Sequence, residues 1–207
     1  RFYWLAATPA REGWTFRGRP STGTSVPGAG FYIDATEAPW ASHYRMASYV
    51  NSELPALIEN HFPAATGVRG IFGHSMGGHG ALVSALRHPE QWQSVSAFAP
   101  IANPVTVPWG EKAFTHYLGA DRSRWCDWDA SELMKAKPRP GLILVDQGLA
   151  DEFLERELHP EALEAAAALS GQALKLRRHA DYDHGYYFIQ SFMADHLAHH
   201  AVALGIE

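Results

Sequence analysis

Short apolar segments alternate with helical segments along most of this chain. The strand-like segments are 68–72, 94–99, 141–146 and 173–178, and the helical segments are 41–61, 76–88, 160–169 and 186–204. The strand-like segments lack regular polar–apolar alternation, so we expect them to be buried on both faces. This order of elements predicts βαβ units and an α/β fold, a mostly parallel sheet flanked by helices on both faces.

The turn between the first of these strands and its helix carries the pattern G-x-S-x-G, as Gly73-His74-Ser75-Met76-Gly77. An apolar strand before the pattern and a helix after it form the setting of a nucleophile elbow, which presents a serine hydroxyl. Glycines are expected there because so sharp a turn leaves no room for a Cβ atom. A less specific interpretation is a glycine-rich helix start at which Ser75 only caps the helix.

A serine nucleophile requires a neighbouring base, which is expected late in the chain when it follows this motif. Among the 12 histidines, His184 is the best candidate, because it lies in a loop at the end of the last strand. His74 and His79 flank the nucleophile and are expected to be badly placed to face its hydroxyl. A turn histidine without a catalytic role is the alternative for His184.

Three further histidines, His196, His199 and His200, lie on the last helix. His196 and His200 have the i, i+4 spacing of a metal-binding pair, but no glutamate accompanies them, so we expect no metal site. Because positive charge is favoured near a helix C-terminus, we expect a solvated histidine cluster instead.

The acid that orients the base is expected after the third strand. Asp146 ends that strand, and Asp151 and Glu152 follow in the next loop. Asp151 has the reach to bond the second nitrogen of His184, where it would fix the tautomer and stabilise the imidazolium. Spacing favours Asp151 only modestly over Asp146 and Glu152. The backbone N–H of Met76, the residue after the nucleophile, is the expected first oxyanion donor.

Composition narrows the class of protein. The chain has 207 residues, of which 46% are hydrophobic, and a net charge of −5. A chain of this kind is expected to form one domain over residues 1–207 and to bind neither nucleic acid nor a membrane surface. Cys126 is the only cysteine, which excludes an intrachain disulfide and favours a reducing compartment. The chain does not open with a signal-peptide pattern, and no apolar run is long enough to span a membrane.

Several separated blocks share a pattern with a known family. The longest is Phe72-Gly73-His74-Ser75-Met76-Gly77-Gly78-His79-Gly80-Ala81-Leu82, and others, in order, are 28–36, Pro39-Trp40, 94–100, Pro108-Trp109-Gly110, Asp146-Gln147-Gly148 and Tyr182-Asp183-His184. In these blocks the chain resembles the S-formylglutathione hydrolase (esterase D) family of α/β-hydrolases. The resemblance runs from about Gly28 to the C-terminus and is far more specific than G-x-S-x-G alone.

The resemblance implies Ser75 as nucleophile, Asp151 as acid and His184 as base. It also implies a cytoplasmic thioesterase that hydrolyses the small-molecule thioester S-formylglutathione to formate and glutathione without a cofactor, often as a homodimer. Trp109 would line the substrate pocket, although an aromatic residue in a proline-rich loop is as often plain packing.

The chain departs from the family at its front. The family has further N-terminal strands, and a Ser-Gly-Leu-Thr-Cys segment that supplies a second oxyanion N–H. Here Leu5 and Ala6 are the candidates for the second oxyanion donor. The sequence does not determine which of them it is, which acyl group is preferred, or whether residues precede Arg1.

Two alternatives therefore remain: a short-chain carboxylesterase without glutathione specificity, and a catalytically silent protein of this fold.

Overall fold

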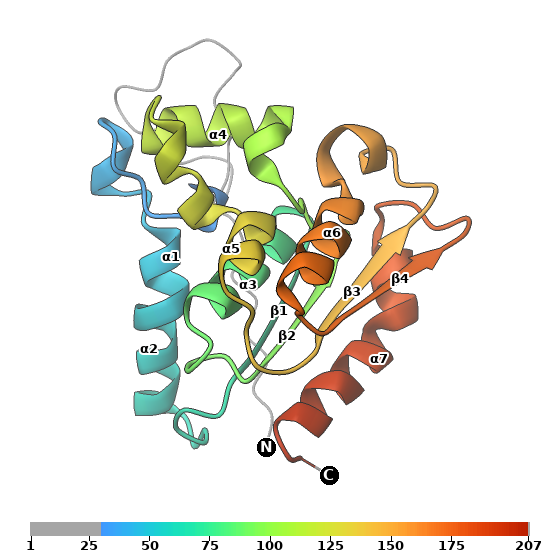
Figure 1. Ribbon diagram of the computed structural model, residues 1–207. Coiled ribbons are helices and arrows are strands. Elements are labelled where there is room, and N and C mark those ends of the chain that lie inside the picture. Colours follow the sequence, from blue (N-terminus) through green and yellow to red (C-terminus); the bar gives the residue numbers. More distant parts are fainter. Residues whose placement is uncertain (1–29, 207) are drawn as a thin grey trace.

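The computed structural model describes residues 30–206, in which four parallel strands form one sheet (Figure 1). The strands are β1 (Gly70–His74), β2 (Ser94–Phe98), β3 (Ile143–Gly148) and β4 (Leu174–His179), and they lie in the order β1-β2-β3-β4. Each strand therefore neighbours the next one in the chain. The predicted parallel sheet is confirmed, and each predicted strand lies within two residues of its expected position.

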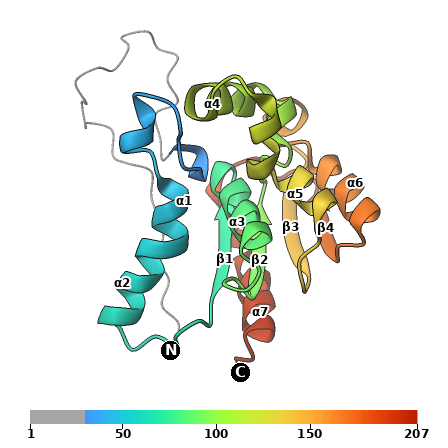
Figure 2. The ribbon, with the colours of Figure 1, turned by 60° about the vertical axis from the view of Figure 1, so that its left-hand side comes forward.

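Helices cover both faces of the sheet, as predicted (Figures 1 and 2). On one face lie α3 (Met76–Arg87), α5 (Ala130–Ala136) and α6 (Pro160–Ser170), and on the other lies α7 (Tyr186–Ala203). Side chains of β2 alternate between the two layers. Val95 and Ala97 join the apolar core beneath α3, α5 and α6, whereas the hydroxyls of Ser94 and Ser96 bond His200 of α7.

A helical segment that precedes β1 in the chain lies beside this sheet. It consists of α1 (Met46–Ser48), the π-helical η3 (Tyr49–Glu53) and α2 (Leu54–His61), after two short 3₁₀ turns, η1 (Gly30–Tyr32) and η2 (Trp40–Ser42). The wider π turn comes just before Pro55, which has no N–H to donate to the helix. The helix expected over 41–61 is confirmed from Met46 onwards, with an irregular turn next to the proline; residues 43–45 are not helical.

The segment 101–136 differs most from the sequence-based expectation. A proline-rich loop was expected through Trp109, but helix α4 (Pro108–Leu118) already begins at Pro108, after the 3₁₀ turn η4 (Pro104–Thr106). Proline suits the first turn of a helix, where its missing N–H has no intrahelical acceptor. Helix α5, also unexpected, is capped by Asp129, whose carboxylate accepts the N–H groups of Ser131 and Glu132.

Helix α4 closes the end of the molecule at which the strands finish (Figure 1). Its side chains Phe114 and Tyr117 join Phe98, the last residue of β2, in a second apolar cluster. The chain then passes through η5 (Arg122–Arg124) and η6 (Cys126–Trp128) to α5, and η7 (Leu154–Leu158) follows β3. This cluster supports the loops that follow β1, β3 and β4.

Two further expectations concern features outside the sheet. Between Gly30 and Ile206, no helix is both long and apolar enough to cross a membrane. The content of Gly, Pro, Ser and Thr in residues 8–30 predicts a long irregular segment, which lies outside the described residues except for Gly30. Cys126 is exposed, and its thiol is free.

Candidate active site

Ser75 occupies a sharp turn between β1 and α3. Its backbone has φ 56° and ψ −122°, a conformation that residues with a side chain rarely adopt. Its N–H donates to the carbonyl of Phe98 at 2.9 Å, and its carbonyl accepts the N–H of His79 at 3.0 Å. These two bonds hold the strained turn from both sides. The side chain makes no capping hydrogen bond to α3, so the interpretation of Ser75 as a simple helix cap is wrong.

Glycine at position 73 is required by the close approach of the helix. A Cβ atom on Gly73 would lie 2.1 Å from the carbonyl oxygen of Gly77. At Gly77 itself the nearest atom to such a Cβ would be the hydroxyl of Tyr32, 3.6 Å away, which is an ordinary contact. The steric reason expected for both glycines of the motif therefore holds for Gly73 and not for Gly77.

His184 and Asp151 form a hydrogen-bonded pair. His184 Nδ1 lies 2.6 Å from Asp151 Oδ2, and the side chain of Asp151 is fully buried. The other oxygen, Oδ1, accepts the N–H of Phe153 at 2.9 Å, and the amide of Gln147 donates to Oδ2 at 3.3 Å. With Nδ1 committed to the carboxylate, Nε2 is the nitrogen of His184 that can take a proton from a nucleophile.

The charge of Asp151 is set by opposing effects. Burial alone would raise the pKa of its carboxyl, but the hydrogen bond from His184 and the N–H of Phe153 outweigh burial, and the pKa is lowered. Asp151 is therefore ionised at neutral pH. A buried carboxylate on Nδ1 favours the imidazolium form of His184 at the moment when a proton arrives.

The loops that carry this pair are joined by backbone contacts. The N–H of Leu149 donates to the carbonyl of His179, and the N–H of Ala150 donates to the carbonyl of Tyr182, both at 2.9 Å. Gly148 makes this closeness feasible, because a Cβ there would lie 2.3 Å from the carbonyl oxygen of Tyr182. The loop after β3 and the loop after β4 thus hold Asp151 and His184 at a fixed separation.

The three predicted residues follow three different strands of the sheet. Ser75 follows β1, Asp151 follows β3 and His184 follows β4, and parallel strands place all of these ends at one edge. The ring of His74, the residue before Ser75, lies 4.3 Å from the ring of His184, centroid to centroid. The fold therefore brings His184 next to the serine turn.

Met76 is the first residue of α3, so its backbone N–H has no intrahelical acceptor. The positive end of the helix dipole lies at the same place, which favours a negative charge beside Ser75. The candidates for the second oxyanion donor, Leu5 and Ala6, lie outside the described residues.

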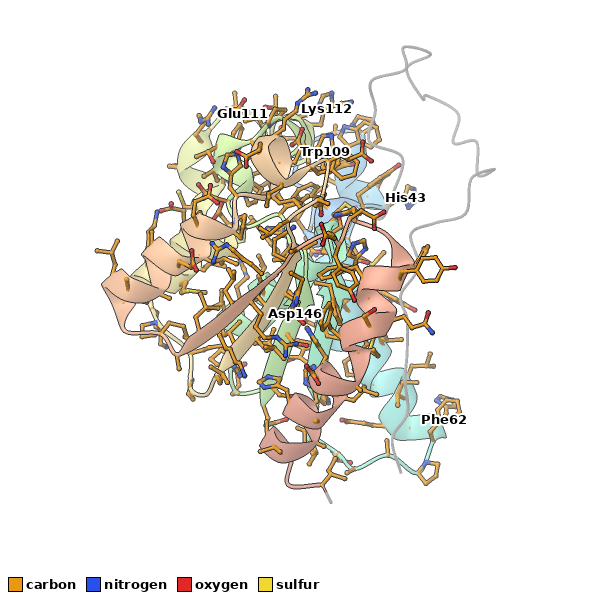
Figure 3. All side chains as sticks on the ribbon, turned by 90° about the vertical axis from the view of Figure 1, so that its right-hand side faces the viewer. His43, Phe62, Trp109, Glu111, Lys112 and Asp146 are labelled. Atoms are coloured by element: carbon orange, nitrogen blue, oxygen red, sulfur yellow. The ribbon has the colours of Figure 1, made fainter. Side chains whose placement is uncertain are left out.

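Asp146, the other carboxylate considered as the acid of the triad, faces α7 (labelled in Figure 3). It is fully buried and bonds Arg177 through both oxygens at 2.5 Å, and its Oδ2 lies 3.1 Å from His196 Nε2. His179 Nε2 lies 3.2 Å from Oδ1. Burial acts to raise the pKa of Asp146, but these partners hold it far below its ordinary value. Its contacts connect β3 to α7 and do not include His184.

The histidines of α7 are not solvated, so that expectation is wrong. His196 and His200 are 0% and 3% exposed. The hydroxyl of Ser96 lies 2.8 Å from His196 Nδ1 and 2.9 Å from His200 Nε2, and His199 Nε2 lies 3.0 Å from the carbonyl of Val95. Burial lowers the pKa of His200 to about 3, so this ring is neutral in the folded protein. The i, i+4 spacing serves to place two rings on the sheet.

Trp109, labelled in Figure 3, lies on α4 and is linked to His184 by one intervening ring. Its ring contacts that of Phe153 at 4.9 Å, and Phe153 in turn contacts the edge of His184 at 5.0 Å. The backbone N–H of Trp109 donates to the buried carboxylate of Glu157 at 2.9 Å. The side chain of Trp109 is 37% exposed. This row of aromatic rings leads from the surface to His184.

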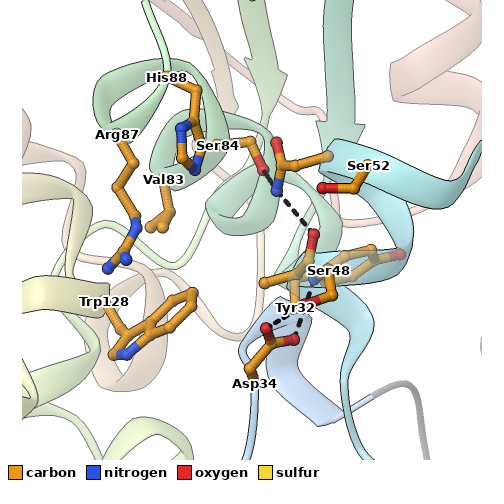
Figure 4. Close-up of a pocket in the computed structure, with 11 residues that line it drawn as sticks. Tyr32, Asp34, Ser48, Ser52, Val83, Ser84, Arg87, His88 and Trp128 are labelled. Carbon is orange, nitrogen blue, oxygen red and sulfur yellow. Dashed lines mark hydrogen bonds between the residues drawn. The ribbon is translucent and has the colours of Figure 1, made fainter. Parts of the chain in front are cut away.

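A hollow of about 130 Å³ lies elsewhere, between η3 and the far half of α3 (Figure 4). Ser84, Arg87 and His88 of α3 line it, whereas Ser75 precedes the first residue of that helix. Asp34 and Ser48, also in its wall, bond each other. This hollow is therefore separate from the serine turn and is not the place where a substrate would meet Ser75.

Sequence reasoning missed several residues that shape the site. Phe153 contacts His184, Gln147 bonds Asp151, and Glu157 bonds the start of α4. Nothing in their spacing marks them, because their role depends on a turn after β3 whose shape only the fold reveals. His74 was set aside as the base because a residue next to the nucleophile was expected to be badly placed to face its hydroxyl, yet the ring of His74 contacts that of His184.

The comparisons with known proteins agree with one another. The family model described as putative esterase matches residues 17–199. An S-formylglutathione hydrolase of Paracoccus denitrificans is 54% identical over 178 residues, which cover 86% of this chain and 63% of the relative. An S-formylglutathione hydrolase of Bos taurus is 48% identical over 199 residues, or 95% of this chain and 71% of the relative. The chain thus spans about two thirds of the length of these relatives.

A solved structure extends this likeness to three dimensions. The S-formylglutathione hydrolase from Agrobacterium tumefaciens has a TM-score of 0.83 and 53% identity with this chain. The match covers 84% of this chain and 63% of the solved one. The sheet and the turn that holds Ser75 thus belong to a fold that is known from experiment.

Proposed function

Because this chain belongs to the putative esterase family and, within it, to the family of the S-formylglutathione hydrolases, an α/β-hydrolase family, we propose that it is a serine hydrolase acting on thioesters of glutathione. The observation that carries the proposal is the 2.6 Å bond between His184 Nδ1 and Asp151 Oδ2, beside a strained serine turn. The substrate, S-formylglutathione, is taken from the names of the relatives.

The reaction follows from the chemistry of the three side chains. His184 Nε2 takes the proton of Ser75 Oγ as that oxygen attacks the thioester carbonyl carbon. The negative charge formed on the carbonyl oxygen is stabilised by the N–H of Met76, and a second donor at Leu5 or Ala6 belongs to the same proposal. The C–S bond then breaks, and the imidazolium of His184 protonates the departing glutathione thiolate, which leaves a formyl ester on Ser75.

Water completes the cycle by the same route. His184 takes a proton from the water molecule that attacks the formyl ester, and returns a proton to Ser75 Oγ as formate leaves. Asp151 stays ionised throughout and stabilises the imidazolium in both halves. We propose that Trp109 lines the substrate pocket, because its ring forms the exposed end of the aromatic row next to His184.

Two further properties belong to this proposal. We place the enzyme in the cytoplasm, because a single cysteine suits a reducing compartment. We also propose a homodimer, as the family resemblance implies. Light scattering of the purified protein tests the second property, and a monomer at all concentrations would contradict it.

The test compares the parent chain with Ser75→Ala and with Ser191→Ala. Ser191 is an exposed serine on α7 whose hydroxyl donates to the carbonyl of Tyr187 in the same helix. We expect hydrolysis of S-formylglutathione by the parent and by Ser191→Ala, and a loss of about 10⁴–10⁶-fold in kcat for Ser75→Ala. A fluorophosphonate probe should label the parent on Ser75.

Other outcomes would point to other functions. Equal kcat/KM for S-formylglutathione and p-nitrophenyl acetate would indicate a carboxylesterase without recognition of glutathione. A folded parent that neither hydrolyses esters nor takes up the probe would contradict catalysis altogether.

A further inference from the structure

The imidazole of His184 needs more than its bond to Asp151 to be held in place. One hydrogen bond to Nδ1 holds one side of the ring, but small changes of the two side-chain torsions can still tilt the ring while that bond is kept. Such a tilt displaces Nε2, which lies on the far side of the ring. A base that must point at one oxygen therefore requires contacts on the ring itself.

Two rings supply such contacts. The ring of Phe153 meets that of His184 at 5.0 Å with an angle of 80° between the planes, an edge-on contact. The ring of His74 lies at 4.3 Å with an angle of 44°. His74 ends β1, which makes it part of the sheet, whereas Phe153 belongs to the loop that carries Asp151. Through the contact with His74, the ring of His184 packs against β1, the strand that leads into Ser75.

One nitrogen of the His74 ring makes no contribution to folding. Its Nε2 is buried and has no hydrogen-bond partner among residues 30–206, which costs stability relative to an apolar side chain. Burial, followed by the charge of His184, lowers the pKa of His74 to about 4, against the opposing effects of Asp151 and of a hydrogen bond between the His74 ring and the backbone of His184. Its ring is therefore neutral at neutral pH and does not repel the imidazolium that forms on His184.

From these contacts we propose that His74 is a positioning residue: its ring fixes the plane of the His184 imidazole so that Nε2 points at Ser75. The inference rests on the proposed function, since it assigns His184 the role of base. It requires a flat side chain at position 74 and does not require a proton to move there.

The experiment compares His74→Leu with His74→Phe in the full chain. Leucine fills space but offers no flat ring, whereas phenylalanine keeps the ring. Both variants remove the unpartnered Nε2 and the hydrogen bond between the ring and the His184 backbone, so the pair isolates the effect of the flat ring. His79→Leu is the matched control. His79 is a buried histidine on α3 whose Nδ1 also lacks a partner among the described residues, whose Nε2 bonds the carbonyl of Trp128, and whose ring contacts Phe31 and Phe114. Turnover is expressed per folded molecule, with circular dichroism to confirm the fold.

We expect His74→Leu to lower kcat about 10- to 100-fold with little change in KM, because the base is misplaced and substrate contacts are kept. His74→Phe should restore most of kcat and unfold near the temperature of the parent, because it loses one hydrogen bond and one unpartnered buried nitrogen. The control should keep the kcat of the parent. A fully active His74→Leu would overturn the proposal, and so would a His74→Phe variant as impaired as His74→Leu.

A second readout separates this inference from the proposed function. The rate at which a fluorophosphonate probe reacts with Ser75 depends on the base and not on glutathione, and it should fall in His74→Leu and recover in His74→Phe. If the parent reacts with the probe but ignores S-formylglutathione, the substrate is wrong and the role of His74 is still decided by these rates. If the parent does not react with the probe, both the proposed function and the role of His74 are refuted.

Discussion

Two buried aspartates five positions apart, Asp146 and Asp151, should respond in opposite ways to the same substitution. Asp146 bonds Arg177 and His196 in the layer beneath α7, and Asp151 bonds His184 at the edge where Ser75 lies. Replacing either by asparagine keeps its size and removes its charge. We expect Asp146→Asn to lower stability and keep turnover, and Asp151→Asn to keep most of the stability and lose turnover.

The cost of Asp146→Asn follows from its partners. Removing one member of a buried ion pair typically costs 3–5 kcal/mol, because the remaining charge stays buried without compensation. Arg177 is 23% exposed and keeps a second partner, Asp195, at 2.5 Å, which favours the lower end. A loss of about 3 kcal/mol corresponds to a Tm about 6–12 °C lower in a chain of this size.

The effect should also depend on pH. The pKa of Asp146 lies far below its ordinary value in the folded protein, whereas an unfolded aspartate titrates near pH 3.9. The stability contributed by its charge is therefore complete above about pH 4 and is lost as the pH falls towards the folded-state pKa. The difference between parent and Asp146→Asn should shrink below pH 4.

For Asp151→Asn the expected loss lies in catalysis. The asparagine can hold His184 in the wrong tautomer, and in serine triads this change lowers kcat by about 10⁴-fold. The structural loss is limited to hydrogen bonds with His184, Gln147 and Phe153, about 1–3 kcal/mol in total.

Thermal unfolding followed by circular dichroism measures the first effect, and ester hydrolysis per folded molecule measures the second. If folded Asp146→Asn lost turnover as strongly as Asp151→Asn, the separation of the two carboxylates into different layers would be refuted. Equal stability of Asp146→Asn and the parent at pH 7 would refute the magnitude argued from the ion pair.

Two further substitutions test the loops and the layer under α7. Gly148→Ala should lower kcat by about 10²-fold, because its Cβ would lie 2.3 Å from the carbonyl oxygen of Tyr182 and displace the loop that carries His184; an unchanged kcat would contradict this. His200→Gln should make the free energy of unfolding fall less steeply below pH 6.5. The imidazole of His200 binds a proton near pH 6.5 in the unfolded chain but only near pH 3 in the folded one. Across that interval the parent therefore loses up to about 5 kcal/mol of stability, which the variant keeps. Urea unfolding at pH 7, 6, 5 and 4 measures the slope, and parallel slopes for parent and variant would refute the role of this histidine.

Most of the sheet could be predicted because its signals are local. β1, β2 and β3 each coincide with a short, mostly apolar run. Prolines and glycines mark helix ends, as Pro160 and Gly171 do around α6. The helices α4 and α5 were missed because they lack such a run. Helix α4 is recognisable only from Pro108 at its start, and α5 from the cap at Asp129. Both are held mainly by the clusters they cover, which no short window of sequence contains.

The histidines of α7 illustrate a different limit. A polar residue near a helix end is usually solvated, and only the pairing of α7 with β2 reveals that Ser94 and Ser96 face its rings. The two serines interrupt the apolar pattern of β2 at alternate positions. That interruption was the available signal for a polar layer inside the protein.

Which aspartate orients His184 depends on the face that each residue of β3 presents to the two helical layers. Ile143 and Val145 join the core beneath α3, so Asp146 must face α7, one residue further along an alternating strand. Asp151 escapes this constraint because it lies beyond the end of the strand, where the turn at Gly148 redirects the chain towards the loop after β4. The alternation of a buried strand, once its layers are known, therefore excludes Asp146 from the site by direction, although its distance along the chain is suitable.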